Sequence, residues 1–451
     1  MSASTASSGA TSPSIRKERG LTGFLDSSPE GVAARKIYLK IFAPATFIII
    51  LVILSIFSIF WGALWKIPAY NLPGIVVDFD GGFLGETVVR ALNDAPNFSK
   101  ITWSTVPASQ FSSGIDSLSD YVFNEKTWVA LSINQGASDR LLASLAEPNP
   151  EYDGTLAITV LAVEARNENA FRSIIRTSVQ ATLDGLKHAV ALQVAQRSSN
   201  ATNLSTLLSV SPQTIISPLS YQLRNLIPFD TPVATAVTFV GMLYQLILSF
   251  FVVMVGMSAR HAAGYETNLS TLALVKLRLA SSFTSYLIIS LFISVLSIAF
   301  QLDVSRKFGN AGFVVFWMVN YACMLSVGLA LESLVTLLTQ KGIPFFMLTW
   351  IIANISVSTF PIEVMPKIFR YGYAAPFYNV SRAMRTVIFG TKNRVGFSFG
   401  ILIVWIAISC FTLPLFQYLA KRKQSRPSPQ ASTDRDADTK EEEKAHADQE
   451  P

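Results

Sequence analysis

Residues 42–65 read FAPATFIIILVILSIFSIFWGALW, a run without a single charged side chain. A helix that rises 1.5 Å per residue needs about 20 apolar residues to cross the hydrocarbon core of a bilayer, so this run is long enough to span a membrane. It starts some 40 residues into the chain, and no small-residue cleavage site follows it cleanly. The run therefore indicates a signal anchor rather than a cleaved signal peptide.

Further apolar runs of similar length follow after a long stretch of ordinary soluble-looking sequence. Half of all residues are hydrophobic and only 15% are charged, whereas soluble proteins carry about 25% charged residues. The pattern predicts an α-helical polytopic membrane protein with six transmembrane helices, one before and five after an α/β domain. The five later runs are Pro232–Met257, Leu279–Gln301, Gly312–Leu338, Ile343–Phe360 and Phe397–Leu419.

The positions of the basic residues predict the orientation. Cytoplasmic loops carry an excess of lysine and arginine, so both termini are expected in the cytoplasm and six crossings satisfy this. The loop after the second helix, with Arg260, His261, Lys276 and Arg278, also falls inside. One segment disagrees, because the loop between helices five and six is basic yet is counted outside. The terminal basic residues are Arg16, Lys17, Arg19, Arg35, Lys36, Lys40, Lys421, Arg422 and Lys423, and those of the exceptional loop are Lys367, Arg370, Arg382, Arg385, Lys392 and Arg394.

These arguments divide the chain into five regions. The two tails cannot bury enough apolar surface to offset the entropy of ordering, so both are predicted to be disordered and cytoplasmic. The regions are a disordered tail 1–40, a transmembrane helix 41–65, an extracytosolic α/β domain 66–231, a five-helix membrane domain 232–420 with a re-entrant hairpin near 361–392, and a disordered tail 421–451.

The domain sequence alternates between strand and helix patterns. Residues 74–80, 128–133 and 156–163 are short β-branched or apolar runs that predict strands, and residues 84–92 have helical spacing. Ser138 and Asp139 are expected to cap a helix that reaches Leu145. A stripe over 165–196 predicts a long amphipathic helix, which either packs on the sheet or faces a partner or lipid. Its apolar positions are 171, 174, 175, 179, 183, 186, 190 and 194.

Sequons for N-glycosylation lie in the same region. Asn97, Asn200 and Asn203 each begin an Asn-X-Ser/Thr pattern, which marks a glycan acceptor on a chain exposed to the secretory lumen. The sequence therefore predicts a glycoprotein whose acceptors lie in the extracytosolic domain.

Catalytic motifs are missing from the sequence. It contains no phosphate-binding loop, zinc-protease motif or nucleophile elbow, so no enzyme activity, cofactor or metal is predicted. Asp78 and Asp80 precede a Gly-Gly pair and are expected to shape a turn. Cys323 and Cys410 fall inside apolar helices and are expected to pack there. The basic residues behind the net charge of +6 lie beside the apolar runs, so this charge does not indicate nucleic-acid binding.

Polar residues inside the membrane are the first candidate site. Glu332 lies deep in the fourth predicted helix, and an intramembrane acid usually faces a bundle interior or a cavity. It is a candidate for a transport path, unless it pairs locally, for example near Lys341. Gln245, Asn320 and Asn354 are expected to form hydrogen bonds between helices.

The second candidate is the segment between the last two helices. Pro361, Pro366 and Pro376 forbid one continuous helix, and Pro376–Phe389 predicts a short amphipathic helix with Arg382 and Arg385 on one side. Irregular backbone at membrane depth needs cover from protein or water, so a re-entrant or interfacial hairpin is expected. Arg382 and Arg385 are candidates to meet anionic lipid headgroups or an anionic substrate, or to anchor the hairpin.

Four motifs resemble the fungal nitrosoguanidine-resistance membrane proteins: PFDTPV (228–233), VGMLY (240–244), YAAPFYN (373–379) and RTVIFGTK (385–392). The resemblance covers roughly residues 40–420. The architecture is similar to that of ABC-2-type permeases of the bacterial phage-infection-protein kind. The resemblance implies tolerance to toxic small molecules, by export or by a change in the plasma membrane, and it transfers no catalytic residue.

Two functions follow as hypotheses. The first is an exporter of small hydrophobic compounds or lipids in the plasma membrane, and the second is a non-transporting protein that organises or regulates membrane lipids or a partner transporter. The expected partners are membrane lipids and small hydrophobic molecules, with a homodimer or a partner ATPase left open, because the chain itself carries no Walker motif.

Overall fold

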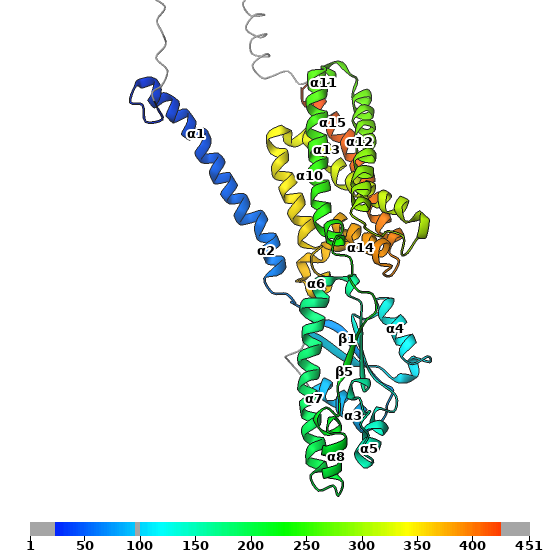
Figure 1. Cartoon of the computed structure of the whole chain (residues 1–451). Coiled ribbons are helices and arrows are strands. Elements are labelled where there is room, and N and C mark those ends of the chain that lie inside the picture. Colours follow the sequence, from blue (N-terminus) through cyan, green and yellow to red (C-terminus); the bar gives the residue numbers. More distant parts are fainter. Residues whose placement is uncertain (1–22, 95–99, 425–451) are drawn as a thin grey trace, which may run out of the picture. The chain divides into compact units, whose positions relative to one another are not determined.

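The computed structural model describes residues 23–94 and 100–424 (Figure 1). The chain divides into two units, the first ending at Ser58 and the second starting at Ile59. Each unit is described by itself. Asn97 and most of the two predicted tails lie outside the described residues.

The described part of the first unit consists mainly of a helix that begins earlier than the apolar run suggested and continues past Ser58. α1 spans Pro29–Val52 and continues through a π-helical turn, Ile53–Phe57, into α2, Ser58–Leu64. The Ser28 hydroxyl accepts a hydrogen bond from the amide of Gly31 (3.1 Å) and Pro29 occupies the first turn, so a capped helix start lies well before residue 41. Residues 29–40, which were predicted to belong to a disordered tail, are therefore helical.

An α/β domain opens the second unit, as the sequence predicted. Its five strands form one sheet in the order β2-β1-β3-β4-β5, in which only the β3–β4 pair is antiparallel. The elements are β1 (Leu72–Asp78), α3 (Phe83–Asp94), β2 (Ile101–Thr105), α4 (Ile115–Phe123), β3 (Val129–Ile133), α5 (Ala137–Ala146), β4 (Ile158–Ala162), α6 (Glu168–Ala170), α7 (Arg176–Ser198), α8 (Leu204–Val210), α9 (Gln213–Ile216) and β5 (Tyr221–Asn225).

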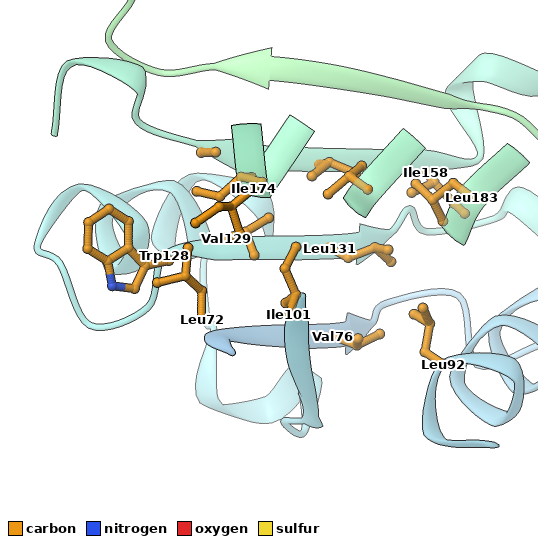
Figure 2. Close-up of a cluster of buried hydrophobic side chains, with 14 of the residues drawn as sticks. Leu72, Val76, Leu92, Ile101, Trp128, Val129, Leu131, Ile158, Ile174 and Leu183 are labelled. Carbon is orange, nitrogen blue, oxygen red and sulfur yellow. The ribbon is translucent and has the colours of Figure 1, made fainter. Parts of the chain in front are cut away.

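The predicted amphipathic stripe packs on the sheet. A π-helical turn, Phe171–Ile175, joins α6 to α7, and all eight predicted apolar positions are buried in one cluster with the sheet. Figure 2 shows Ile174 and Leu183 of this helix lying toward Val129, Leu131 and Ile158 of the strands. α4 covers the opposite face, because its buried residues cluster with the alternate strand positions. The stripe is therefore a core face of the domain.

Two details of the domain follow from the turn after β1. The Asp78 carboxylate accepts hydrogen bonds from the amides of Asp80 (2.9 Å) and Gly81 (3.0 Å), which confirms its turn role. Ser138 does not cap α5 as predicted. Instead its amide donates to Asp80 Oδ1 (2.9 Å) and its hydroxyl donates to Asp80 Oδ2, so this aspartate joins the β1 turn to α5.

Five described helices are long and apolar enough to cross a membrane, counting the first unit. They are Pro29–Leu64, Ala236–Ala262, Thr271–Ala299, Gly309–Ser356 and Val395–Arg422. The corresponding elements of the second unit are a π-helical turn Ala236–Val240, α10 (Gly241–Ala262), α12 (Thr271–Ala299), α13 (Gly312–Ser356) and α15 (Val395–Gln424), with the short α11 (Tyr265–Asn268) after α10.

The chain reverses direction within α13, coloured yellow-green to yellow in Figure 1. Before α13, Arg306 forms an ion pair with Asp230 of the domain (2.9 Å), and after it the carbonyl of Thr359 accepts from Asn167 of the domain (3.3 Å). Both ends of α13 therefore adjoin the domain. Thr339, with φ 59° and ψ 176°, is non-helical and separates segments 312–338 and 340–356. This break matches the boundary between the predicted fourth and fifth helices.

The same kind of contact orients the other helices. Arg394, just before α15, pairs with Glu125 of the domain, whereas Gln417 near the end of α15 meets Arg278 of α12. α10, α12, the two segments of α13 and α15 thus run between one end at the domain, called the domain end, and an opposite end, called the far end.

A short helix lies at the domain end between α13 and α15. Two 3₁₀ segments, Ile362–Val364 and Lys367–Ala374, lead into α14, Pro376–Phe389, which has the bounds that the sequence predicted. Most of α14 is buried, since it packs on α13, α15 and the domain. It is an internal element of the second unit rather than an exposed amphipathic helix.

Candidate functional site

Glu332 lies in a buried cluster of charges near the far end of the helices. Its carboxylate oxygen Oε1 is 2.6 Å from Nε of Arg278 on α12 and 3.1 Å from Nη2 of Arg260 on α10. The side chains of Glu332, Arg278 and Arg260 are only 2%, 3% and 8% exposed. One carboxylate therefore forms ion pairs with two guanidinium groups, and these three side chains together carry a net positive charge.

Arg278 links three helices. Its guanidinium donates to Thr336 Oγ1 (2.8 Å) and to the backbone carbonyl of Glu332, both on α13, and to Gln417 Oε1 on α15 (2.6 Å). Charged groups this deep in a helical bundle are tolerated when each donor has an acceptor, and here the acceptors come from different helices. The cluster therefore holds α10, α12, α13 and α15 together.

Sequence reasoning identified Glu332 but missed both of its partners. The search for uncharged apolar runs placed the start of the third helix at Leu279, because Arg278 is charged. It therefore assigned Arg260 and Arg278 to the loop before this helix. In the structure Ser270 caps a helix that starts at Thr271, through a hydrogen bond from the amide of Ala273 (3.3 Å), so Arg278 lies two turns inside α12. The helix-capping signal at Ser270 was the available clue.

An apolar cavity of about 490 Å³ lies between α10 and α12. Phe251, Val255 and Ile288 line it and are 56%, 69% and 50% exposed, so the cavity opens on the apolar flank of the helices. Its inner wall is polar, because Arg260, Glu332 and the serines 281, 282 and 285 also line it.

A second cavity, of about 180 Å³, adjoins the same charge cluster. It is lined by Arg260, Arg278, Glu266, Thr336 and Gln417, together with a few apolar side chains. Arg260 lines both cavities, so a mostly apolar space and a mostly polar space meet at the same charged side chain. A molecule with an apolar body and a polar end matches this pair of environments.

A second group of ion pairs joins α14 to the domain. Arg385 Nη1 lies 2.5 Å from Glu168 Oε2 and donates to the carbonyl of Ala165 (3.1 Å), and these two charged side chains are 6% and 10% exposed. Arg382 and Arg394 share Glu125, at 2.5 Å and 3.1 Å. The structure thus places both arginine candidates against acids of the domain.

These pairs account for the basic loop that disagreed with the orientation rule. Arg382, Arg385 and Arg394 are paired with Glu125 and Glu168, and Lys392 Nζ donates to the carbonyl of Asn124 (2.7 Å). Most of the positive charge of this loop is therefore held by the domain. It does not act as a free topological signal in the way that short basic loops do.

The acids of this junction titrate below their usual range. Burial raises the pKa of Glu125, but the charges of Arg382, Arg166 and Arg394 outweigh it, so its pKa lies below 4.5. Burial also raises the pKa of Glu168, which Arg385 then lowers below 4.5. A carboxyl whose folded pKa is depressed stabilises the fold fully above the unfolded pKa and loses that contribution as pH falls through the folded pKa.

We therefore expect acid to weaken the junction. The thermal midpoint of the detergent-purified chain should fall as pH is lowered below 4.5, because Glu125 and Glu168 take up protons that the folded state disfavours. A Glu125→Gln variant should start less stable at neutral pH and decline less steeply in acid. Parallel acid profiles for the two proteins would contradict this assignment.

The polar residues expected to link helices do so. Gln245 on α10 donates to Asn320 Oδ1 on α13 (2.7 Å), and Asn320 donates to Ser294 Oγ on α12 (2.9 Å). Asn354 Oδ1 accepts from the amide of Phe377 at the start of α14 (3.2 Å). Each has a partner on another element, as predicted for interhelical hydrogen bonds.

The sequons differ in their surroundings. Asn97 lies outside the described residues. Asn200 is exposed after the end of α7. Asn203 is partly buried, and its side-chain nitrogen donates to the carbonyls of Leu145 (2.9 Å) and Ala146 (3.0 Å). The atom that would carry a glycan is therefore accessible at Asn200 and engaged at Asn203.

Comparison with known proteins extends over almost the whole described chain. A model of the family described as "Protein of unknown function (DUF3533)" matches residues 45–411. The uncharacterized endoplasmic reticulum membrane protein YJR015W of Saccharomyces cerevisiae is 26% identical over 426 residues, which cover 88% of this chain and 83% of that protein. No solved structure matches. The matched region includes both the charge cluster and the α14 junction.

Proposed function

This chain belongs to the DUF3533 family of membrane proteins, and we propose that it is a transporter-like protein that exports small hydrophobic compounds or lipids and carries out no catalysis. One observation carries the proposal: an apolar cavity on the flank of α10 and α12 is lined by buried Arg260 and Glu332, and Arg260 also lines a second, more polar cavity.

The cavity suits a molecule that enters from the bilayer. Exposed Phe251, Val255 and Ile288 lie on a face that lipid chains would contact, so an apolar molecule reaches the cavity without crossing water. At the inner wall Arg260 and Glu332 offer a polar end point. Ligand sites in membrane helices commonly combine apolar walls with a few charged groups that face a cavity.

The proposed topology has six crossings, with the domain outside and both termini in the cytoplasm. The first helix and five segments between the domain end and the far end support this count. Short basic segments near Lys276 and Lys421 lie at the far end, which supports a cytoplasmic far end. This arrangement also supports the proposed likeness to ABC-2-type permeases.

A glycan test decides the orientation. If the domain is in the lumen, we expect a glycan on Asn200, because its side chain is exposed, and little on Asn203, whose nitrogen already makes two hydrogen bonds. Treatment with a glycosidase should sharpen the gel band of the wild-type chain, and Asn200→Gln should remove most of that shift whereas Asn203→Gln should remove little. An unglycosylated chain, with all its sequons silent, would count against a luminal domain.

The location and energy source follow from the same proposal. We place the protein in the membranes of the secretory pathway with the plasma membrane as its destination, although the yeast relative carries the endoplasmic reticulum in its name. A fluorescent fusion imaged with markers of both membranes distinguishes the two. Because the sequence holds no Walker motif, the energy comes from an ion gradient or a partner ATPase.

Filling the cavity is the sharpest test of export. Ser285 lines the cavity, is only partly buried and lies apart from the ion cluster, so Ser285→Phe should block the space and leave Glu332 paired. Ser297→Phe is the matched control, since it makes the same change three turns further along α12. Cells loaded with nitrosoguanidine and apolar toxins should retain several-fold more compound with Ser285→Phe than with the wild type, as measured by mass spectrometry.

The outcomes separate the two hypotheses. Retention that rises with Ser285→Phe alone, and also when the proton gradient or ATP is removed from wild-type cells, supports export. Equal amounts of compound in all strains together with altered survival would overturn export and favour a protein that organises lipids or regulates another transporter. The level of each variant at the membrane is measured in the same cells.

A further inference from the structure

A small cavity of about 40 Å³ lies where the α/β domain meets α14. One water needs about 10–15 Å³ measured in this way, so the cavity has room for a few waters or one small oxyanion. Three arginines, one from the domain and two from α14, line it together with hydroxyl and amide groups. These residues are Arg166, Arg382, Arg385, Asn167, Ser358 and Ser381.

Arg166 differs from the other arginines of this junction. Arg382 and Arg385 each contact a carboxylate at 2.5 Å, but no carboxylate of the described residues lies within 4.0 Å of Arg166. Its guanidinium stacks over the ring of Trp128, with the carbon 3.4 Å from the ring centroid, and one nitrogen donates to the carbonyl of Thr127 (2.9 Å). The side chain is thus fixed in place without a counter-ion in contact.

Burial lowers the pKa of Arg166 to about 10, although the nearby charges of Glu125 and Glu363 raise it, so the charge is disfavoured in the folded protein yet is retained at neutral pH. A buried charge without a paired opposite charge is costly unless something compensates it. Stacking on Trp128 offsets part of that cost.

The charged residues that line the cavity are mostly positive. Three arginines (166, 382 and 385) line it, and Arg382 and Arg385 pair with Glu125 and Glu168, which are not among the lining residues. The acid among the lining residues is Glu363, and it is exposed at the rim. The Ser381 hydroxyl accepts from Arg385 Nε (3.4 Å), which leaves its proton free to donate. A bound anion would complete this set of donors.

We propose that this cavity binds a phosphate-type oxyanion, held by Arg166 with the help of Arg382, Arg385 and Ser381. Arginine suits such a ligand because its planar fork donates two parallel hydrogen bonds to phosphate oxygens. The cavity holds a phosphate group and little more, so the group is either a free anion or the head of a phospholipid whose chains remain outside. The position of the cavity, between the membrane helices and the domain, allows both sources.

Thermal stability of the full-length chain in detergent tests the site. Inorganic phosphate, at fixed ionic strength against chloride, and short-chain phosphatidic acid, against the matching diacylglycerol, are added separately. We expect a midpoint that rises with one of the phosphate compounds. Arg166→Gln should weaken that response about tenfold or more in ligand concentration, because it removes a charge-assisted pair of hydrogen bonds.

Arg172→Gln is the matched control. Arg172 lies in the same domain and loses the same charge, but its side chain is 59% exposed and pairs with Glu164, away from the cavity lining. Its response to phosphate compounds should equal that of the wild type. Without ligand, Arg166→Gln should be less stable than the wild type, since it loses the stacking on Trp128 and the hydrogen bond to Thr127, so the response of each variant is measured from its own ligand-free midpoint.

The results identify the ligand source or overturn the site. A response to inorganic phosphate indicates a free anion, whereas a response to phosphatidic acid alone indicates a lipid headgroup. No response to either compound, or equal responses in Arg166→Gln and Arg172→Gln, overturns the proposal. If Arg166→Gln fails to fold, Ser381→Val fills the cavity without a change of charge, and an undiminished response in that variant overturns it equally.

Discussion

Replacing Glu332 with glutamine is expected to lower the free energy of unfolding by about 3–5 kcal/mol, the cost of breaking a buried ion pair by removing one partner. The loss falls at the high end here because Glu332 is the acid shared by Arg260 and Arg278, at 3.1 Å and 2.6 Å. Glutamine would leave both buried cations facing a neutral side chain and each other.

The two arginines should respond in a fixed order. Arg260→Gln leaves one acid and one cation, a neutral pair, so it should be the mildest of the three changes. Arg278→Gln also leaves a pair but removes the hydrogen bonds to Thr336 and Gln417, so it should be intermediate. Thermal midpoints of the three detergent-purified variants measure the order. A midpoint for Arg260→Gln as low as that for Glu332→Gln would show that the shared acid is not the central group.

Breaking the ion pair between α14 and the domain should cause the second-largest loss of stability. Arg385→Gln leaves Glu168 buried without its cation, and Glu168→Gln leaves Arg385 likewise, so each should cost about 3–5 kcal/mol. The double variant leaves two neutral groups of similar shape. It should therefore lose less than the sum of the two single changes.

Limited proteolysis reads out this second effect beside thermal midpoints. The single variants should be cleaved faster than the wild type in the segment that joins the domain to the membrane helices, and the double variant should recover part of the resistance. Arg172→Gln breaks the half-exposed pair with Glu164 and should lower the free energy of unfolding by about 1 kcal/mol or less. Its cleavage rate and its thermal midpoint should therefore stay close to those of the wild type. Strictly additive effects in the double variant would contradict a direct Glu168–Arg385 coupling.

Local patterns of the sequence predicted much of this fold. The stripe from Phe171 to Val194 and the helix Pro376–Phe389 were found at their observed positions, since apolar spacing and proline positions act over one or two turns. The edge strands β2 and β5 were missed. They are short and half exposed, so they lack the buried run that identified β3 and β4.

Only some residues of each candidate site could be predicted from the sequence, for a related reason. Glu332 and Arg385 stand out within their own segments, but Arg278 is 54 residues from Glu332, and Arg385 is 220 residues from its acceptor Ala165. No single-segment pattern relates such pairs. Arg166 gave no signal at all, because its stacking on Trp128 exists only after the domain has folded.

The acids and the arginines of the α14 junction lie far apart in the sequence, so they are synthesised at different times. A chain is made from its N-terminus, and domains generally fold as units while it emerges. Glu125 and Glu168 are thus in place in a finished domain before Arg382 and Arg385 have been translated. The domain must fold with these carboxylates in water, and only the arrival of α14 closes them in. A ribosome-bound chain stopped before Pro376 should therefore display a folded domain with an open acidic edge, which chaperones or neighbouring membrane proteins can reach during that interval.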